Sequence, residues 1–254
     1  MKLYYQTTGT GQPLVILHGL FGSSDNWRGL AKKLATQAQV ITVDLRNHGR
    51  SPHSSEQTYA LMVEDLAELF ERLTLDKVDI IGHSMGGKVA IAFSQRYPQW
   101  LRKLVVVDIA PRQYDDEHSV IFKNLLALDL SLYANRNEVD NALKNTLPNK
   151  AVRQFLLMNL TLNDEQLSWR INLQALYDNY SQLLKAVCDG NTIMIPSCFI
   201  RGGQSDYIRD KDENLIRTCF PNVELATIEQ AGHWVHADAP QQFLTKITEF
   251  LDYD

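Results

Sequence analysis

The chain has 254 residues, of which 44% are hydrophobic and 22% charged, and its formal net charge is −5. These values are typical of a globular protein with a sizeable core, and they exclude the basic surface of a nucleic-acid-binding protein. No apolar run approaches the ~18 residues that cross a bilayer. The first residues lack the apolar segment of a secretory signal, so we expect neither export nor membrane insertion.

The three cysteines, Cys188, Cys198 and Cys219, are widely spaced and contain no C-x-x-C pair for a metal or redox centre. We therefore expect three unpaired, inert thiols, as in a reducing compartment. The sequence predicts a cytoplasmic protein without a bound metal.

Short apolar, β-branched segments alternate with helical patterns through the first 110 residues. Buried strands separated by helices predict an α/β fold with a mostly parallel central sheet flanked by helices. Residues 2–12 are typical of an antiparallel edge strand that ends in a glycine-rich turn. The expected strands are 13–19, 39–45, 77–83 and 103–110, and the expected helices are 26–37, 58–75 and 86–98.

The pattern changes at about residue 111, where four helical segments follow one another without a convincing strand. Strand character returns at 196–203 and 223–229, and a helix is expected at 239–251. The sequence thus predicts one domain over 1–254, with a core of 1–110 and 191–254. A helical cap of about 111–190 interrupts the core next to the strand ends, where open α/β sheets bind ligands.

Residues 79–93, DIIGHSMGGKVAIAF, contain two competing motifs. Residues 82–86 fit G-x-S-x-G, a sharp strand-to-helix turn that presents a nucleophilic serine, here Ser84. The same stretch fits the front of a phosphate-binding loop, but that loop needs Ser or Thr after its lysine, and Val89 stands there. We favour the serine turn and interpret Lys88 as an ordinary solvent-facing helical lysine.

A serine nucleophile needs a base and donors for the oxyanion. His233 follows a predicted strand and precedes the last helix, the place of the base in the order nucleophile, acid, histidine. The N–H of Met85, directly after the nucleophile, is one expected donor. Leu20, in the turn after the strand 13–19, is the second, with Phe21 as the alternative.

With these pieces the sequence resembles the α/β-hydrolase superfamily. LHGLFGS, DLRNHGRS, IGHSMGGK and AGHWVHADAP occur in the expected order. Within the superfamily the chain is similar to the small YbfF-like bacterial acyl esterase/thioesterase group. The resemblance implies hydrolysis of esters or thioesters, no cofactor, and a helical cap over the site.

The acid of the triad departs from the usual pattern of the superfamily. The G-x-x-D motif aligns on Gly203 to give Asp206, or on Gly202 to put Ser205 in the acid's place. Asp108, at the end of the strand after the nucleophile strand, is the rival, and we favour it. The YbfF-like group is similar to hydrolases that place the acid there.

In the cap and beside the base, Trp169, Arg170 and Trp234 are candidates for substrate contacts. The expected partner is a small-molecule substrate, an acyl ester or thioester with a short to medium acyl chain. An acyl-CoA is one such thioester. A lyase or C–C bond hydrolase using the same triad, or a non-catalytic ligand-binding member of the fold, is the alternative. The natural substrate, the acyl length and the oligomeric state stay open.

Overall fold

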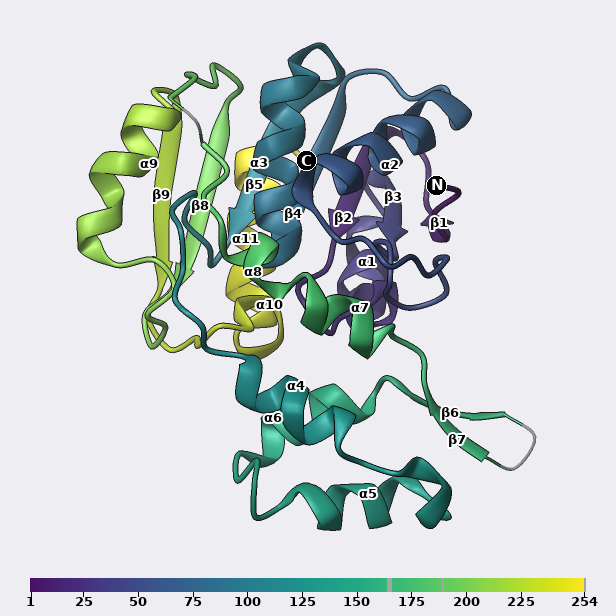
Figure 1. Cartoon of the computed structure of the whole chain (residues 1–254). Helices are drawn as coiled ribbons and strands as arrows, with labels where there is room; N and C mark the ends of the chain where they lie inside the picture. The colour runs from purple at the N-terminus through teal and green to yellow at the C-terminus, as the bar shows by residue number, and fades with distance from the viewer. Residues whose placement is uncertain (164–165, 189, 254) are drawn as a thin grey trace.

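The computed structural model describes residues 1–163, 166–188 and 190–253. Its centre is a seven-stranded sheet in the order β1-β3-β2-β4-β5-β8-β9 (Figure 1). All neighbouring pairs are parallel except β1 with β3, which confirms the mostly parallel sheet and the antiparallel edge strand. The strands are β1 (Tyr5–Thr8), β2 (Gln12–Leu17), β3 (Ala38–Val43), β4 (Val78–His83), β5 (Leu101–Val107), β8 (Ser197–Gly202) and β9 (Val223–Ile228).

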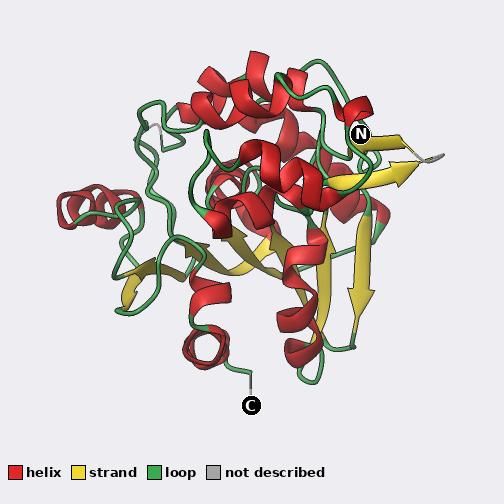
Figure 2. Ribbon diagram, turned by 90° about the horizontal axis from the view of Figure 1, so that it is seen from below, coloured by secondary structure: helices red, strands yellow, loops and turns green. Residues whose placement is uncertain are grey.

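Helices cover both faces of this sheet (Figure 2), as the continuous apolar strands predicted. Side chains alternate along β2: Leu14 and Ile16 join the core cluster that contains Phe243 of the last helix. Val15 and Leu17 join the other cluster, with the helices before and after β4. The helices of the core are α1 (Arg28–Leu34), α2 (Tyr59–Arg72), α3 (Met85–Arg96), α9 (Glu213–Cys219), α10 (Val235–Asp238) and α11 (Pro240–Leu251).

A largely helical segment lies between β5 and β8 and gathers at one end of the sheet (Figure 1). The expectation that this segment contains no strand is wrong, because β6 and β7 form an antiparallel hairpin. Each strand has four residues, too short for alternation to stand out beside the helical pattern before it. The elements of the segment are α4 (Ser119–Leu126), α5 (Arg136–Leu143), α6 (Lys150–Leu157), β6 (Leu160–Asn163), β7 (Gln166–Trp169), α7 (Leu173–Asp178) and α8 (Tyr180–Leu184).

The expectation of three unpaired thiols is wrong for two of them, because Cys188 and Cys219 form a disulfide. The chain that returns from α8 toward β8 passes the end of α9, where the N–H of Ile193 donates to the carbonyl of Cys219. This packing brings together two cysteines 31 residues apart, a spacing that matches no sequence motif. Cys198 is a free, buried thiol. The cytoplasmic location loses the support of unpaired thiols and stays a prediction.

Four short 3-10 helices complete the described secondary structure: Ser24–Trp27, Pro98–Trp100, Leu130–Leu132 and Asp210–Asp212. Within the described ranges, no helix combines the length and the apolar character needed to cross a bilayer.

Candidate active site

Ser84 lies at the turn between β4 and α3 with φ 52° and ψ −117°, a backbone conformation that L-residues rarely adopt. Two glycines make the turn possible. A Cβ on Gly82 would lie 2.4 Å from the carbonyl oxygen of Gly86, and one on Gly86 would lie 2.5 Å from that of His18. The turn places Ser84 at the N-terminus of α3, where unpaired N–H groups favour negative charge.

Asp108 follows β5 and is completely buried. Its Oδ2 accepts a hydrogen bond of 2.7 Å from Nδ1 of His233, which follows β9. Because parallel strands end at one edge of the sheet, two residues 125 positions apart meet there. With Nδ1 donating to a carboxylate, the Nε2 of His233 carries the lone pair and is the atom able to accept a proton.

The two alignments of the G-x-x-D motif select Asp206 and Ser205, and the structure puts these two side chains in different environments. Asp206 is exposed to solvent, whereas Asp108 receives the imidazole. The hydroxyl of Ser205 donates to Oδ2 of Asp108, and the N–H of Gly202 donates to its Oδ1 at 3.0 Å. The sequence motif considers Ser205 only as the residue aligned with the acid. That Ser205 donates a hydrogen bond to Asp108 could not be predicted, because the contact depends on the fold.

The loop after β2 carries Leu20 and Phe21, two of the three candidate oxyanion donors, and the third, Met85, begins α3. The N–H of Phe21 already donates to Nε2 of His48 at 3.3 Å, so it is not free for a substrate. Leu20 and Met85 both line the cavity beside Ser84. Met85 is the first residue of α3, and its N–H therefore has no partner four residues earlier within the helix.

Two buried histidines fix this loop. Nδ1 of His18 donates to the carbonyl of Gly19, and its Nε2 accepts from the N–H of Leu45. Nδ1 of His48 donates to the carbonyl of Arg46. Burial lowers the pKa of His48 to about 3, and burial also lowers the pKa of His18. Both imidazoles are therefore neutral at pH 7 and act as structural hydrogen-bonding groups.

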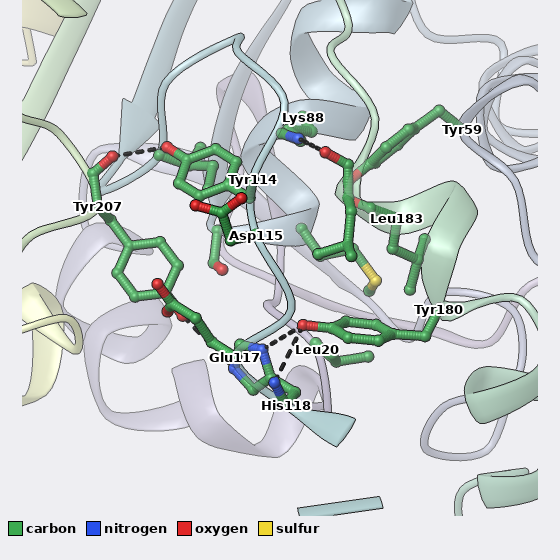
Figure 3. Close-up of a pocket in the computed structure, with 14 residues that line it drawn as sticks. Leu20, Tyr59, Lys88, Tyr114, Asp115, Glu117, His118, Tyr180, Leu183 and Tyr207 are labelled. Carbon is green, nitrogen blue, oxygen red and sulfur yellow. Dashed lines mark hydrogen bonds between the residues drawn. The ribbon is translucent and has the colours of Figure 1, made fainter. Parts of the chain in front are cut away.

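A cavity opens beside Ser84, between the core and the inserted segment (Figure 3). Four tyrosines contribute to its wall, and the hydroxyls of three of them bond to protein carbonyls or to His118 at 2.6–2.8 Å. The rings rather than the hydroxyls are therefore available to a ligand. The lining residues are Leu20, Tyr59, Ser84, Met85, Lys88, Ile109, Tyr114, Asp115, Glu117, His118, Tyr180, Leu183, Leu184 and Tyr207.

Lys88 lines the same cavity, and the prediction that it faces solvent is wrong, since only 1% of its surface is exposed. Its Nζ donates to the carbonyls of Leu184 and Lys185, at 3.3 and 2.6 Å. It also lies 4.7 Å from the ring centre of Tyr114. Burial lowers the pKa of Lys88 to about 7. The sequence offered one indication that Lys88 lies near the site: it comes four residues after Ser84, in an apolar part of the helix.

The three residues predicted to contact substrate do not line this cavity. Arg170 forms an ion pair with Asp25 at 3.2 Å, while Trp169 is half-buried at the end of β7. The ring of Trp234 packs against Phe155 with centres 5.2 Å apart. Their assignment to substrate binding gains no support from the cavity. Among the described residues, no group of three or more His, Cys, Asp or Glu side chains could hold a metal ion.

Comparison with known proteins supplies independent information. The family model for the alpha/beta hydrolase fold matches residues 12–240. The sn-1-specific diacylglycerol lipase ABHD11 of Danio rerio is 38% identical, and the match covers 96% of this chain and 79% of that protein. Esterase YbfF of Escherichia coli is 34% identical, with 97% and 96% covered. The solved structure of a marine microorganism esterase is 40% identical, with a TM-score of 0.96 and 98% and 99% of the two chains covered.

Proposed function

The chain belongs to the α/β-hydrolase family, and from that premise we propose that it is a serine hydrolase of carboxylic acyl esters or thioesters. Relatives named as esterases and as a lipase support carboxylic ester hydrolysis as the reaction. The observation that carries the proposal is the 2.7 Å hydrogen bond between His233 and buried Asp108, at the sheet edge where Ser84 is held in a sharp turn.

In the proposed mechanism Ser84 is the nucleophile and His233 the base. Nε2 of His233 takes the proton of the hydroxyl as the Ser84 oxygen attacks the acyl carbon. Asp108 holds the imidazole in the required tautomer and stabilises the imidazolium that forms. His233 then gives the proton to the leaving alcohol or thiol. A water activated by the same imidazole releases the acid from the acyl-enzyme.

The oxyanion would be held by the backbone N–H groups of Leu20 and Met85. Phe21 is less suited because His48 already takes its N–H. One such donor contributes about 2.7–4 kcal/mol to transition-state stabilisation in a well-studied protease. The support of the loop by His18 and His48 would keep the N–H of Leu20 oriented before substrate binds.

The wall of the cavity supports an acyl group as the part of the substrate bound beside Ser84, and we expect that group to be short to medium in length. Its wall consists largely of tyrosine rings and leucine side chains, and burial of apolar acyl surface against them is favourable by about 25 cal/mol per Å². The carboxylates of Asp115 and Glu117 line the same cavity, which disfavours an anionic acyl group. An acyl-CoA and a simple ester present the same acyl group to this wall, so both belong in the test.

The test is hydrolysis of p-nitrophenyl esters and acyl-CoA thioesters of graded chain length. Wild-type protein is compared with Ser84→Ala and with Ser94→Ala, a matched control on the same helix whose hydroxyl bonds to the carbonyl of Ile91. We expect turnover by the wild type and by Ser94→Ala, and its loss in Ser84→Ala. Equal turnover by Ser84→Ala would overturn the proposed nucleophile.

The alternatives make a different prediction for the same experiment. A lyase or C–C bond hydrolase with these residues would turn over a carbon acid and show negligible activity on every ester and thioester. A non-catalytic member of the fold would bind acyl compounds without releasing product. Absence of turnover across the whole series would therefore reject the esterase and thioesterase proposal.

A further inference from the structure

The ring of Tyr207 lies flat against the ring of His233. The two ring centres are 3.9 Å apart and the planes differ by 20°. Tyr207 comes two residues after Ser205, and its N–H donates to the Ser205 hydroxyl at 3.3 Å. One short loop after β8 therefore contacts both the carboxylate and the imidazole of the proposed triad.

Two further contacts hold Tyr207 in this position, and a third holds His118, which makes one of them. The hydroxyl of Tyr114 donates to the backbone carbonyl of Tyr207 at 2.6 Å. The Tyr207 hydroxyl lies 3.4 Å from Nε2 of His118, and Nδ1 of His118 lies 2.8 Å from the hydroxyl of Tyr180. His118 directly precedes α4 and Tyr180 begins α8. The inserted segment thus contacts Tyr207 at its hydroxyl end.

We propose that Tyr207 is a positioning residue for His233: its ring sets the plane of the imidazole and stabilises the imidazolium that forms when Ser84 loses its proton. The face of an aromatic ring carries negative charge density, and a cation placed over it is attracted. This inference rests on the proposed function, because it assigns Tyr207 a part in the same proton transfer. Neutral imidazole gains less from the ring face than imidazolium does, so the contact favours the transition state over the resting enzyme.

The other titratable groups around His233 do not supply this effect. Nε2 of His83 donates to the carbonyl of His233, and burial lowers the pKa of His83 well below its ordinary value. Burial lowers the pKa of His236 to about 3 and that of His118 to about 4. These three imidazoles are therefore neutral at pH 7. The carboxylate of Asp108 is hydrogen-bonded to His233. The carboxylate of Glu117 lines the cavity.

The first experiment follows the protonation of His233 itself and needs no substrate. Imidazole ¹⁵N shifts are recorded against pH for wild type, Tyr207→Leu and Tyr207→Phe, with His233→Asn used to assign the signal. We expect Tyr207→Leu to lower the protonation midpoint of His233 by about half a unit to one unit, within the range of a cation–π contact. Tyr207→Phe retains the ring face and should restore the midpoint. An unchanged midpoint in Tyr207→Leu would overturn the proposal.

Kinetics provide the second readout. In Tyr207→Leu we expect kcat to fall about three- to tenfold, with the acid limb of the kcat/KM profile displaced by the same amount as the NMR midpoint. A higher KM with unchanged kcat and acid limb would make Tyr207 only a wall of the cavity. Tyr97→Leu, at the far end of α3, controls for loss of a tyrosine ring, and thermal unfolding checks the fold. If the NMR shift occurs in a protein that hydrolyses no ester, the proposed function fails while the ring contact stands.

Discussion

Ser205 and His233 donate hydrogen bonds to the same atom, Oδ2 of Asp108. The other carboxylate oxygen accepts the N–H of Gly202. A buried carboxylate with three donors is held in one orientation, because each hydrogen bond to a charged group contributes about 1.5–3 kcal/mol. The imidazole of His233 is therefore fixed from one side by a carboxylate that cannot rotate freely.

Two variants, Asp108→Asn and Asp206→Asn, distinguish between the two candidate acids of the triad. Asp108→Asn should lower kcat by about 10³–10⁴, because the amide favours the wrong imidazole tautomer. Asp206→Asn should retain activity close to wild type, since this carboxylate is exposed. Steady-state hydrolysis of one p-nitrophenyl ester measures both. Collapse of activity in Asp206→Asn, with little change in Asp108→Asn, would reverse the assignment.

Removal of the Ser205 hydroxyl should weaken catalysis without abolishing it. Ser205→Ala leaves Asp108 with two donors in place of three, and we expect kcat to fall by about ten- to a hundredfold, the equivalent of one hydrogen bond to a charged group. Ser197→Ala, which removes a hydroxyl at the start of β8 that donates to the carbonyl of Ile195, is the matched control. Equal kcat for the two variants would mean that Ser205 has no part in holding the acid.

Lys88 makes stability depend on pH. Burial lowers the pKa of Lys88 from 10.5 to about 7 in the folded protein. Between about pH 7 and 10.5 the unfolded chain therefore binds a proton that the folded chain releases, and stability rises with pH through this window. Relative to Lys88→Met, the free energy of unfolding of the wild type should increase by roughly 1–4 kcal/mol from pH 7 to 10.

Urea unfolding of both proteins at several pH values measures this difference. Lys33→Met replaces an exposed lysine of α1 and should show no comparable pH dependence. If the wild type and Lys88→Met keep a constant difference in unfolding free energy from pH 7 to 10, Lys88 does not titrate as its burial implies.

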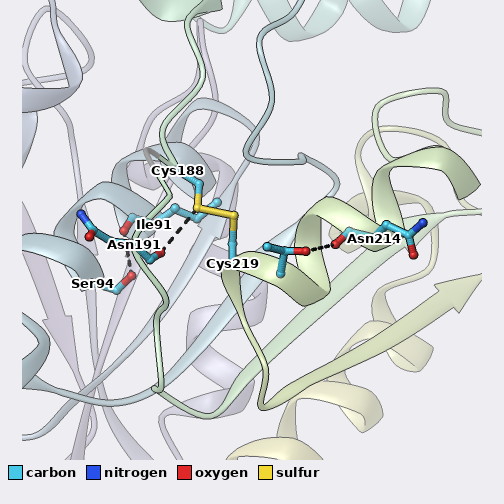
Figure 4. Close-up of a disulfide and its surroundings, with 7 residues drawn as sticks. Ile91, Ser94, Cys188, Asn191, Asn214 and Cys219 are labelled. Carbon is cyan, nitrogen blue, oxygen red and sulfur yellow. Dashed lines mark hydrogen bonds between the residues drawn. A yellow bond between two sulfur atoms is a disulfide. The ribbon is translucent and has the colours of Figure 1, made fainter.

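The disulfide ties the returning end of the inserted segment to α9 (Figure 4). Closing a loop of this length restricts the unfolded chain, and Cys219→Ala should reduce the free energy of unfolding by about 3 kcal/mol. Thiol titration of the oxidised, denatured protein should find one thiol, that of Cys198, and three after reduction. Three thiols before reduction would contradict the bond, and Cys198→Ala controls for loss of a cysteine elsewhere.

Local sequence patterns were sufficient to predict the order of the strands in the core and most of its helices, but not α9 and α10. The strand ending at Leu17 and the helix beginning at Met85 follow from apolar spacing and from the glycines around Ser84, all within a few residues. The hairpin of β6 and β7 was missed because four-residue strands give too short an alternation. Lys88 was misjudged because a single polar residue in a helix does not reveal what covers it.

The class of the fold, the serine turn and the histidine in the loop before the last helix could be predicted from the chain alone, because these depend on residues near one another. The folded structure was needed to establish that Asp108 rather than Asp206 bonds to His233, that Ser205 bonds to the same carboxylate, and that Tyr207 lies against the imidazole. It also paired Cys188 with Cys219. These contacts join loops that follow different strands, and their geometry depends on how the sheet brings the strand ends together rather than on any local pattern.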